Sequence, residues 1–266
     1  MTSYSHPKCY AQSTCKCSKK ISAEHIISKN LLKVFERNKT VRISGLPWME
    51  KEKFTRISSQ SVKSKVLCKR HNELLSPLDA EAGKFLRCIQ GFDDDFNSPN
   101  PKDEEQELNG HTIEKWMLKT VCGLIASNQI MPKGDRTVLA LKEIYIDLLF
   151  NDMKWPENWG LYFRYTVGEQ IHKYDCFGVS CHTGGGEVKG AEFLINNFKF
   201  FLVLGQPENP DSFGLYRLNK IHMTDQRVAK TIEFNWLDKK FDKWIALNRT
   251  ATTSEAPKEW PDWMKD

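Results

Sequence analysis

A divided set of cysteine and histidine residues constrains the fold of this chain more than any other feature. Cys9, Cys15 and Cys17 lie near the amino terminus, and Cys68 and His71 follow about fifty residues later with the spacing Cys-x-x-His. Thiolates and imidazoles are the ligands that a structural Zn²⁺ prefers, and the fold has to bring two distant half-sites together. The sequence therefore predicts a structural zinc held by Cys68, His71, Cys9 and one or both of Cys15 and Cys17.

The remaining composition indicates the class of protein. The chain has 266 residues, of which 40% are hydrophobic and 11% aromatic, so it can bury a sizeable core in one large or two smaller domains. It has no run of eighteen apolar residues, and its first residues lack the apolar region of a secretory signal. We therefore expect a soluble cytoplasmic protein without membrane contact, whose clustered cysteines bind metal instead of forming disulfides.

Charge is distributed unevenly along the chain. Residues 1–70 carry sixteen Lys or Arg against four Glu, a net charge of +12, so the remaining residues are net acidic within the total of +5. A basic segment of this size attracts nucleic acid, because phosphates neutralised by Lys and Arg release counterions. Its alternative role is a solubilising surface. The predicted metal site in the same segment favours nucleic acid.

The basic segment also contains residues suited to a second metal site. β-Branched residues predict a strand in 19–29 that carries Glu24 and His25 near its end, and 62–68 is its expected partner. Apolar residues at helical spacing follow in 71–90, with Asn72 at the start of the helix. Taken alone, Glu24 and His25 can be an edge-strand pair without a role, and Asn72 a helix cap. Together they suit a hard cation beside a general base.

The segments SAEHIISKNLL and KVLCKRHNELLSPLD resemble the HNH, or ββα-metal, endonuclease family, and the resemblance covers roughly residues 9–90. It implies that His25 is the general base and that Glu24 and Asn72 bind a catalytic Mg²⁺ or Mn²⁺. Because a zinc-bound imidazole cannot accept a proton, His25 and His71 need separate roles. The chain departs from the family at Ser64, where an Asn that orients the base is common.

The resemblance implies a metal-dependent endonuclease that hydrolyses phosphodiester bonds of DNA, with RNA as another possible substrate and defence against phage as a possible role. Basic residues expected to contact nucleic acid are Arg42, Lys65, Lys69 and Arg70. The alternative function is a non-catalytic, zinc-dependent module that binds nucleic acid or protein.

The rest of the chain predicts an α+β fold. We expect an HNH-like domain at 1–91, an acidic linker at 92–107, and an accessory or sensor domain at 108–266 with two helices and an antiparallel sheet. The segment at His182, followed by Thr and three Gly, lacks the Lys-Ser/Thr of a phosphate-binding loop, which favours a hairpin. The accessory domain is also the expected site of a protein partner or of homo-oligomer formation.

Overall fold

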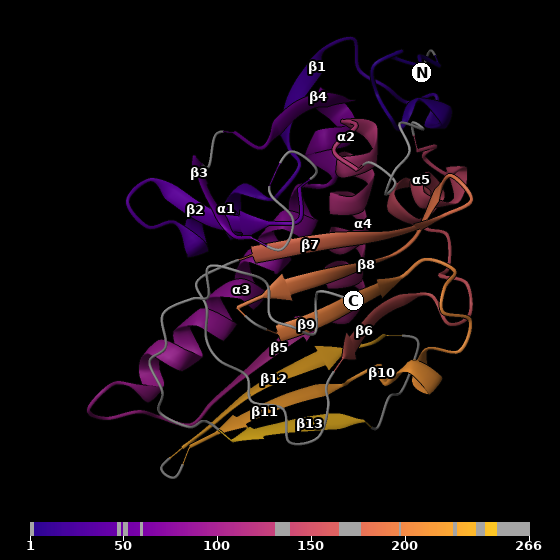
Figure 1. The fold of residues 1–266 in the computed structure, drawn as a ribbon. Coiled ribbons are helices and arrows are strands. Elements are labelled where there is room, and N and C mark those ends of the chain that lie inside the picture. Colours follow the sequence, from indigo (N-terminus) through magenta and orange to yellow (C-terminus); the bar gives the residue numbers. More distant parts are fainter. Residues whose placement is uncertain are drawn as a thin grey trace.

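The structure is a computed structural model that describes residues 3–46, 49, 53–58, 61–130, 139–164, 177–196, 198–225, 228–237 and 243–248. These residues form a mixed α+β fold with three sheets (Figure 1). The first sheet is the pair β1 (Ile21–His25) and β4 (Lys63–Cys68), which run antiparallel. It is followed directly by α2 (Lys69–Leu74) and α3 (Ser76–Phe96), so the predicted order of strand, insertion, strand and helix is present.

The insertion between β1 and β4 joins the second sheet. It contains α1 (Lys29–Phe35), β2 (Thr40–Ser44) and β3 (Thr55–Ser58). β2 pairs in parallel with β7 (Phe177–Gly184), which places the two strands of the insertion at one edge of a seven-stranded sheet with the order β10-β6-β9-β8-β7-β2-β3. The remaining strands of that sheet are β6 (Gly160–Arg164), β8 (Glu187–Ile195), β9 (Phe198–Val203) and β10 (Leu215–Tyr216).

The expectation that 92–107 is a linker was wrong, because both ends of this segment belong to regular elements. α3 continues to Phe96, and β5 (Glu104–Asn109) pairs in parallel with β12 (Ala229–Asn235) in a third sheet, which is completed by β11 (Lys220–Thr224) and β13 (Trp244–Asn248). Phe92 and Phe96 are buried four residues apart on α3, and Lys230 binds the Asp95 carboxylate at 2.5 Å. These contacts offset the polar composition, and one continuous apolar core spans both expected domains.

The helix α4 (Gly110–Ala126) is the centre of that core. It contacts β4, β6, β9 and β12, and therefore all three sheets, and it also packs against α3 and α5 (Glu143–Phe150). Most of its residues are buried, which explains why its apolar residues are not confined to one stripe. Asn109 caps the helix by accepting a hydrogen bond from the Thr112 backbone N–H at 2.9 Å.

The carboxyl-terminal half contains the predicted β-rich part. β7 and β8 form a hairpin whose turn is Gly185 and Gly186, both at positive φ, so the glycine segment after His182 is the turn of a hairpin, as expected. The sequence did not predict β11, β13 or β5, and half of the residues of β5 are Glu. In the part of the chain that the structure describes, no helix has both the length and the apolar character needed to cross a membrane.

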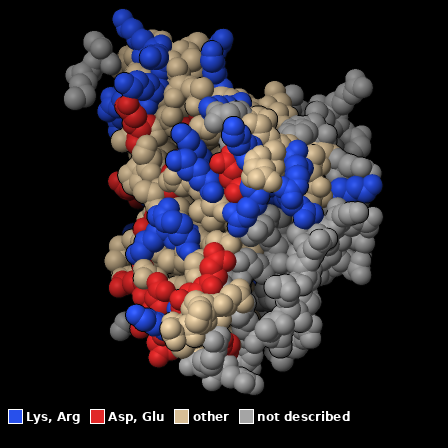
Figure 2. All heavy atoms as spheres, turned by 90° about the vertical axis from the view of Figure 1, so that its left-hand side faces the viewer, with Lys and Arg blue, Asp and Glu red and all other residues tan. Residues whose placement is uncertain are grey.

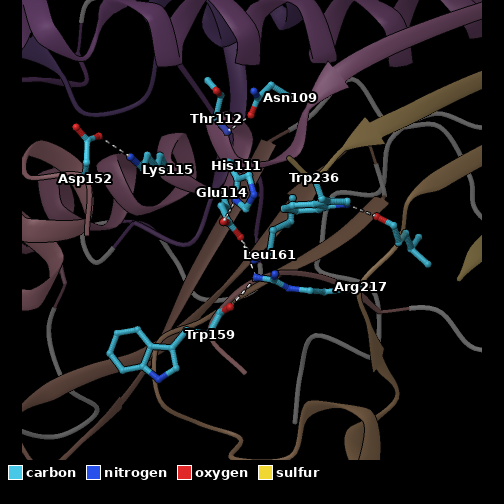
Figure 3. Close-up of polar contacts among 11 residues, drawn as sticks. Asn109, His111, Thr112, Glu114, Lys115, Asp152, Trp159, Leu161, Arg217 and Trp236 are labelled. Atoms are coloured by element: carbon cyan, nitrogen blue, oxygen red, sulfur yellow. Dashed lines mark hydrogen bonds and ion pairs between the residues drawn. The ribbon is translucent and has the colours of Figure 1, made fainter. Parts of the chain in front are cut away.

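A buried ion pair attaches the amino-terminal part of α4 to β6 and to the residue that follows β10 (Figure 3). The Glu114 carboxylate accepts hydrogen bonds from Arg217 Nη2 at 2.9 Å and from the backbone N–H of Leu161 at 3.1 Å, and it lies 2.9 Å from His111 Nδ1. Gly160 has a φ of +115°, and a Cβ atom there would overlap both Arg217 Nη2 and Glu114 Oε2. A side chain at position 160 is therefore incompatible with this pair.

We predict that Gly160→Ala lowers the free energy of unfolding by about 3 kcal/mol or more, because it forces apart a buried ion pair. Urea unfolding followed by circular dichroism measures the loss. Gly186→Ala is the control: this residue also has positive φ, +78°, but no atom of the described residues lies within 4 Å of the added Cβ. The control should lose only about 1 to 2 kcal/mol from backbone strain. Equal losses in the two variants would contradict the role of the ion pair.

Candidate metal centre and adjoining polar cluster

Four residues near the amino terminus form a buried cluster with the geometry of a metal site. The ligand atoms of Cys9, Cys17, Cys68 and His71 all lie within 4.8 Å of one another. His71 Nδ1 lies 3.4 Å from Cys9 Sγ, 3.7 Å from Cys17 Sγ and 3.3 Å from Cys68 Sγ. A tetrahedral zinc, with bonds of about 2.3 Å to sulfur and 2.0 Å to nitrogen, places such atoms roughly 3.5 Å apart. The cluster can therefore hold a structural zinc.

Local structure explains how the two half-sites meet. Cys9 and Cys17 flank the short 3₁₀-helix η1 (Gln12–Thr14), whereas Cys68 ends β4 and His71 lies in α2. The backbone N–H of Tyr10 donates to the Val66 carbonyl at 2.9 Å, which attaches the amino-terminal loop to β4. The hairpin and the loop thus bring together residues separated by about fifty positions in the sequence.

Neighbouring groups orient the ligands. Thr14 Oγ1 donates its hydrogen to the Ala11 carbonyl at 2.9 Å, so it accepts a hydrogen bond from His71 Nε2, also at 2.9 Å. Nε2 therefore carries the imidazole hydrogen, and the lone pair of Nδ1 faces the three sulfur atoms, as metal binding requires. Burial alone would raise the pKa of the Cys68 thiol, but backbone N–H groups of His71 and Ser18 outweigh it and lower that pKa, which favours the thiolate.

Cys15 lies outside the cluster, which resolves the choice left open by the sequence. It is exposed, ends η1 at a φ of 54°, and its sulfur accepts a hydrogen bond from Ser5 Oγ at 3.6 Å. That hydrogen bond lowers the pKa of the Cys15 thiol. Cys17 is buried with the other ligands and Cys15 is exposed, so Cys17 and not Cys15 completes the set.

A second polar cluster lies beside the first, where β1, α3 and α4 meet. Lys119 Nζ on α4 binds Glu24 Oε1 on β1 at 2.7 Å and Asp79 Oδ2 on α3 at 2.6 Å. Both Glu24 and Lys119 are buried. Burial raises the pKa of Glu24, and the attraction of Lys119 opposes this shift without cancelling it. The ammonium of Lys119 thus occupies the position between two carboxylates where a cation would bind.

Several polar atoms around this cluster are buried and have no hydrogen-bond partner among the described residues. They are Tyr10 Oη, His25 Nε2, Ser28 Oγ and Asp79 Oδ1. Such atoms are uncommon in folded proteins and often mark a functional position. The negative charges of Glu24 and Asp79 both act on Tyr10, whose pKa is raised mainly by burial.

His25 ends β1 directly opposite Lys63 on β4. Its Nε2 is buried without a hydrogen-bond partner among the described residues, and the side chain as a whole is half-buried. Burial lowers the pKa of the imidazole, and the nearby ammonium groups of Lys63, Lys29 and Lys119 lower it further. The imidazole is therefore neutral at neutral pH and able to accept a proton.

The ligands expected for a catalytic cation do not bind a common partner. Asn72 Nδ2 donates to Ser22 Oγ at 2.9 Å, whereas Glu24 binds Lys119. Ser64 pairs with Glu24 in the strand ladder, not with His25, so it does not take the position of the residue that orients the base. Carboxylates and an amide suit Mg²⁺ or Mn²⁺ chemically, but with Lys119 between the carboxylates this set does not fit a divalent cation.

The role of Lys119 and Asp79 in the buried polar cluster was not predicted from the sequence. A signal was present for Lys119, because a lone Lys inside the apolar run WMLKTVCGL has to find a buried partner. The identity of the partners had no local signal, since Glu24 and Asp79 come from elements 95 and 40 residues earlier in the chain.

The basic residues expected to bind nucleic acid are mostly at the surface. Lys65, Lys69 and Arg70 are exposed, whereas Arg42 is half-buried with its guanidinium 5.6 Å from the centre of the Phe54 ring. Figure 2 shows Lys and Arg spread over the upper and middle parts of one face, with Asp and Glu concentrated below. On this face, basic and acidic side chains therefore lie mostly in different regions.

We found no match to this chain among protein families, curated proteins or solved structures. The Cys₃His cluster and the Lys119 cluster are therefore defined by their geometry alone.

We predict that Cys17→Ser lowers zinc affinity by more than about 100-fold, because it removes one of four ligands. Loss of a hydrogen-bond partner of a ligand typically costs less, about 10- to 100-fold. Zinc content by elemental analysis and competition with a chromogenic chelator measure the change. Cys15→Ser is the matched control, two residues away and exposed, and should keep one zinc per chain. Loss of zinc in the Cys15 variant with retention in the Cys17 variant would overturn the assignment.

We also predict that Lys119→Met lowers the free energy of unfolding by about 3 to 5 kcal/mol, because Glu24 is left buried without its counter-charge. Urea unfolding measures the loss, and the double variant Lys119→Met with Glu24→Gln should recover part of it. Lys115→Met on the same helix is the control, since its ion pair with the exposed Asp152 spans 3.8 Å and should be worth less than about 1 kcal/mol. Similar losses at the two lysines would contradict a central role for Lys119.

Proposed function

We propose that this chain hydrolyses phosphodiester bonds of DNA, with His25 as the general base. The observation that carries the proposal is the position of His25, which is half-buried and ends β1 beside lysine ammonium groups. A neutral imidazole in this position accepts a proton from water as the water attacks phosphorus. The resemblance of the surrounding sequence to HNH endonucleases supports the same role.

The lysines around His25 suit the binding of a phosphate. Lys63 lies opposite His25 in the strand ladder, and Lys29 begins α1; both are exposed. Their ammonium groups can attract a scissile phosphate and offset the charge that develops on it. Lys65 on β4, and Lys69 and Arg70 at the start of α2, extend the basic surface from the same hairpin. The Cys₃His cluster stabilises this hairpin, so zinc would support binding without taking part in the reaction.

We assign no step to a divalent cation. The family resemblance implies Mg²⁺ or Mn²⁺ at Glu24 and Asn72, but Lys119 holds Glu24 at 2.7 Å and Asn72 binds Ser22. A cation at Glu24 would have to displace a buried ammonium, at a considerable electrostatic cost. Assays with Mg²⁺, with Mn²⁺ and with a chelator therefore test whether cleavage requires a divalent cation.

The contact between Lys119 and Glu24 favours a second candidate, a zinc-stabilised module that binds nucleic acid without cutting it. If Glu24 serves only as the partner of Lys119, the chain keeps its basic surface and lacks the cation that phosphodiester hydrolysis usually employs. Binding is common to both candidates, and cleavage separates them.

We predict that the purified chain cuts plasmid DNA and that His25→Ala lowers the rate by about 10² to 10⁴-fold, the usual contribution of a general base. Gel assays with plasmid and with RNA measure cleavage in each ion condition. Added imidazole should restore part of the activity of the His25 variant, which a purely structural role would not allow. Cleavage by His25→Ala at the wild-type rate would exclude His25 as the base. Binding without cleavage under any of the ion conditions would favour the second candidate.

The affinity of the chain for DNA can be measured separately from cleavage. Lys63→Ala and Lys29→Ala should each weaken DNA binding. Each should also reduce the slope of log affinity against log salt concentration, measured between about 50 and 200 mM, by roughly one. Fluorescence anisotropy with a labelled duplex measures both quantities. Lys154→Ala is the control, because Lys154 is exposed in the carboxyl-terminal half. Equal effects at Lys154 and Lys63 would show that binding is not localised at the hairpin.

A further inference from the structure

A pocket of about 630 Å³ lies on the seven-stranded sheet, away from the two clusters described above. Its lining includes residues of β6, β7, β8 and β9 and of the loop that contains the 3₁₀-helix η2 (Pro210–Phe213). Phe200 and Leu202 of β9 belong to the main core, whereas Phe201 and Val203 belong to a separate small cluster with Tyr162 and Leu215. Because side chains alternate along a strand, the pocket lies on the outer face of the sheet.

The pocket has aromatic walls. Phe201 is nearly buried, and the ring of His182 lies beside it with centroids 5.2 Å apart and planes inclined by 33°. Phe213 also lines the pocket and is 66% exposed, which is unusual for so large an apolar side chain. Flat aromatic surfaces of this kind bind planar rings by stacking.

The pocket also contains the cationic side chain of Arg164. Arg164 is exposed, and among the described residues its guanidinium forms no ion pair or hydrogen bond. Lys189, by contrast, binds Glu187 Oε2 at 2.7 Å and shares that oxygen with Lys142. A guanidinium is well suited to bind a phosphate or carboxylate through two parallel hydrogen bonds.

The remaining polar residues restrict the ligand. Gln206 and Asn209 line the pocket and supply amide groups that can donate and accept hydrogen bonds. Glu208 also lines it, and its carboxylate disfavours a ligand with more than one phosphate group. The volume falls within the range of about 300 to 1,000 Å³ that is typical of small-molecule sites.

We propose that this pocket binds a small ligand with one planar ring and one anionic group, of the class of a nucleoside monophosphate. The ring contacts Phe201, His182 and Phe213, the anion binds Arg164, and the amides of Gln206 and Asn209 contact the edge of the ring. This site is independent of the proposed hydrolysis, because none of its residues belongs to either cluster near the amino terminus.

Isothermal titration calorimetry on the full chain with adenosine, guanosine, cytidine and uridine 5′-monophosphates tests the site. At least one should bind with a dissociation constant below about 1 mM, whereas adenosine, which lacks the anion, and ribose 5-phosphate, which lacks the ring, should bind at least about tenfold more weakly. Failure of all four monophosphates to bind would overturn the proposal, as would equal binding of adenosine and its monophosphate.

Two variants locate the binding. Arg164→Ala should weaken it by about 10- to 100-fold through loss of charge-assisted hydrogen bonds, and Phe213→Ala by about tenfold through loss of stacking. Both side chains are exposed, so unfolding in urea should be unchanged, and Lys154→Ala should leave affinity unchanged. Wild-type affinity in both pocket variants would place the ligand elsewhere and overturn the assignment.

Discussion

The contact between Lys119 and two carboxylates joins the parts of this molecule. Glu24 lies on β1, Asp79 on α3 and Lys119 on α4, so one ammonium fixes the positions of three elements. Burying charged groups is costly, and the cost is tolerated only when each partner is present with good geometry. The Cys₃His cluster brings the amino-terminal loop against β4 and α2, and the Lys119 bridge attaches β1 to the central helix. The position of His25, the residue after Glu24, depends on the same bridge.

Much of the local structure was predictable from the sequence. Cysteine and histidine spacing indicated the metal cluster, and alternating or helical patterns indicated the hairpin, α3, α4 and most strands of the carboxyl-terminal half. These features depend on residues close together in the sequence or on strong ligand chemistry. The choice between Cys15 and Cys17 was not predictable, because it depends on how the loop around η1 places each thiol.

The long-range features were not predictable for a different reason. The pairings of β2 with β7 and of β5 with β12 are parallel and join segments more than a hundred residues apart. Local composition contains no signal of such pairing, and the acidic residues around Phe92 and Phe96 gave the impression of a linker. The same limitation applies to the candidate site, where the sequence indicated Glu24 and His25 but not the lysine that holds Glu24 in place.

The position of α4 has a consequence for how the protein can be divided. A helix that contacts three sheets exposes apolar surface on every side when any one of them is removed. A fragment ending near residue 91 would leave α3 and β4 without the helix that covers them, and a fragment starting near 108 would lack the strands that complete two of the sheets. The backbone amides of α4 should accordingly open only when the whole chain unfolds, so that its two halves behave as one cooperative unit.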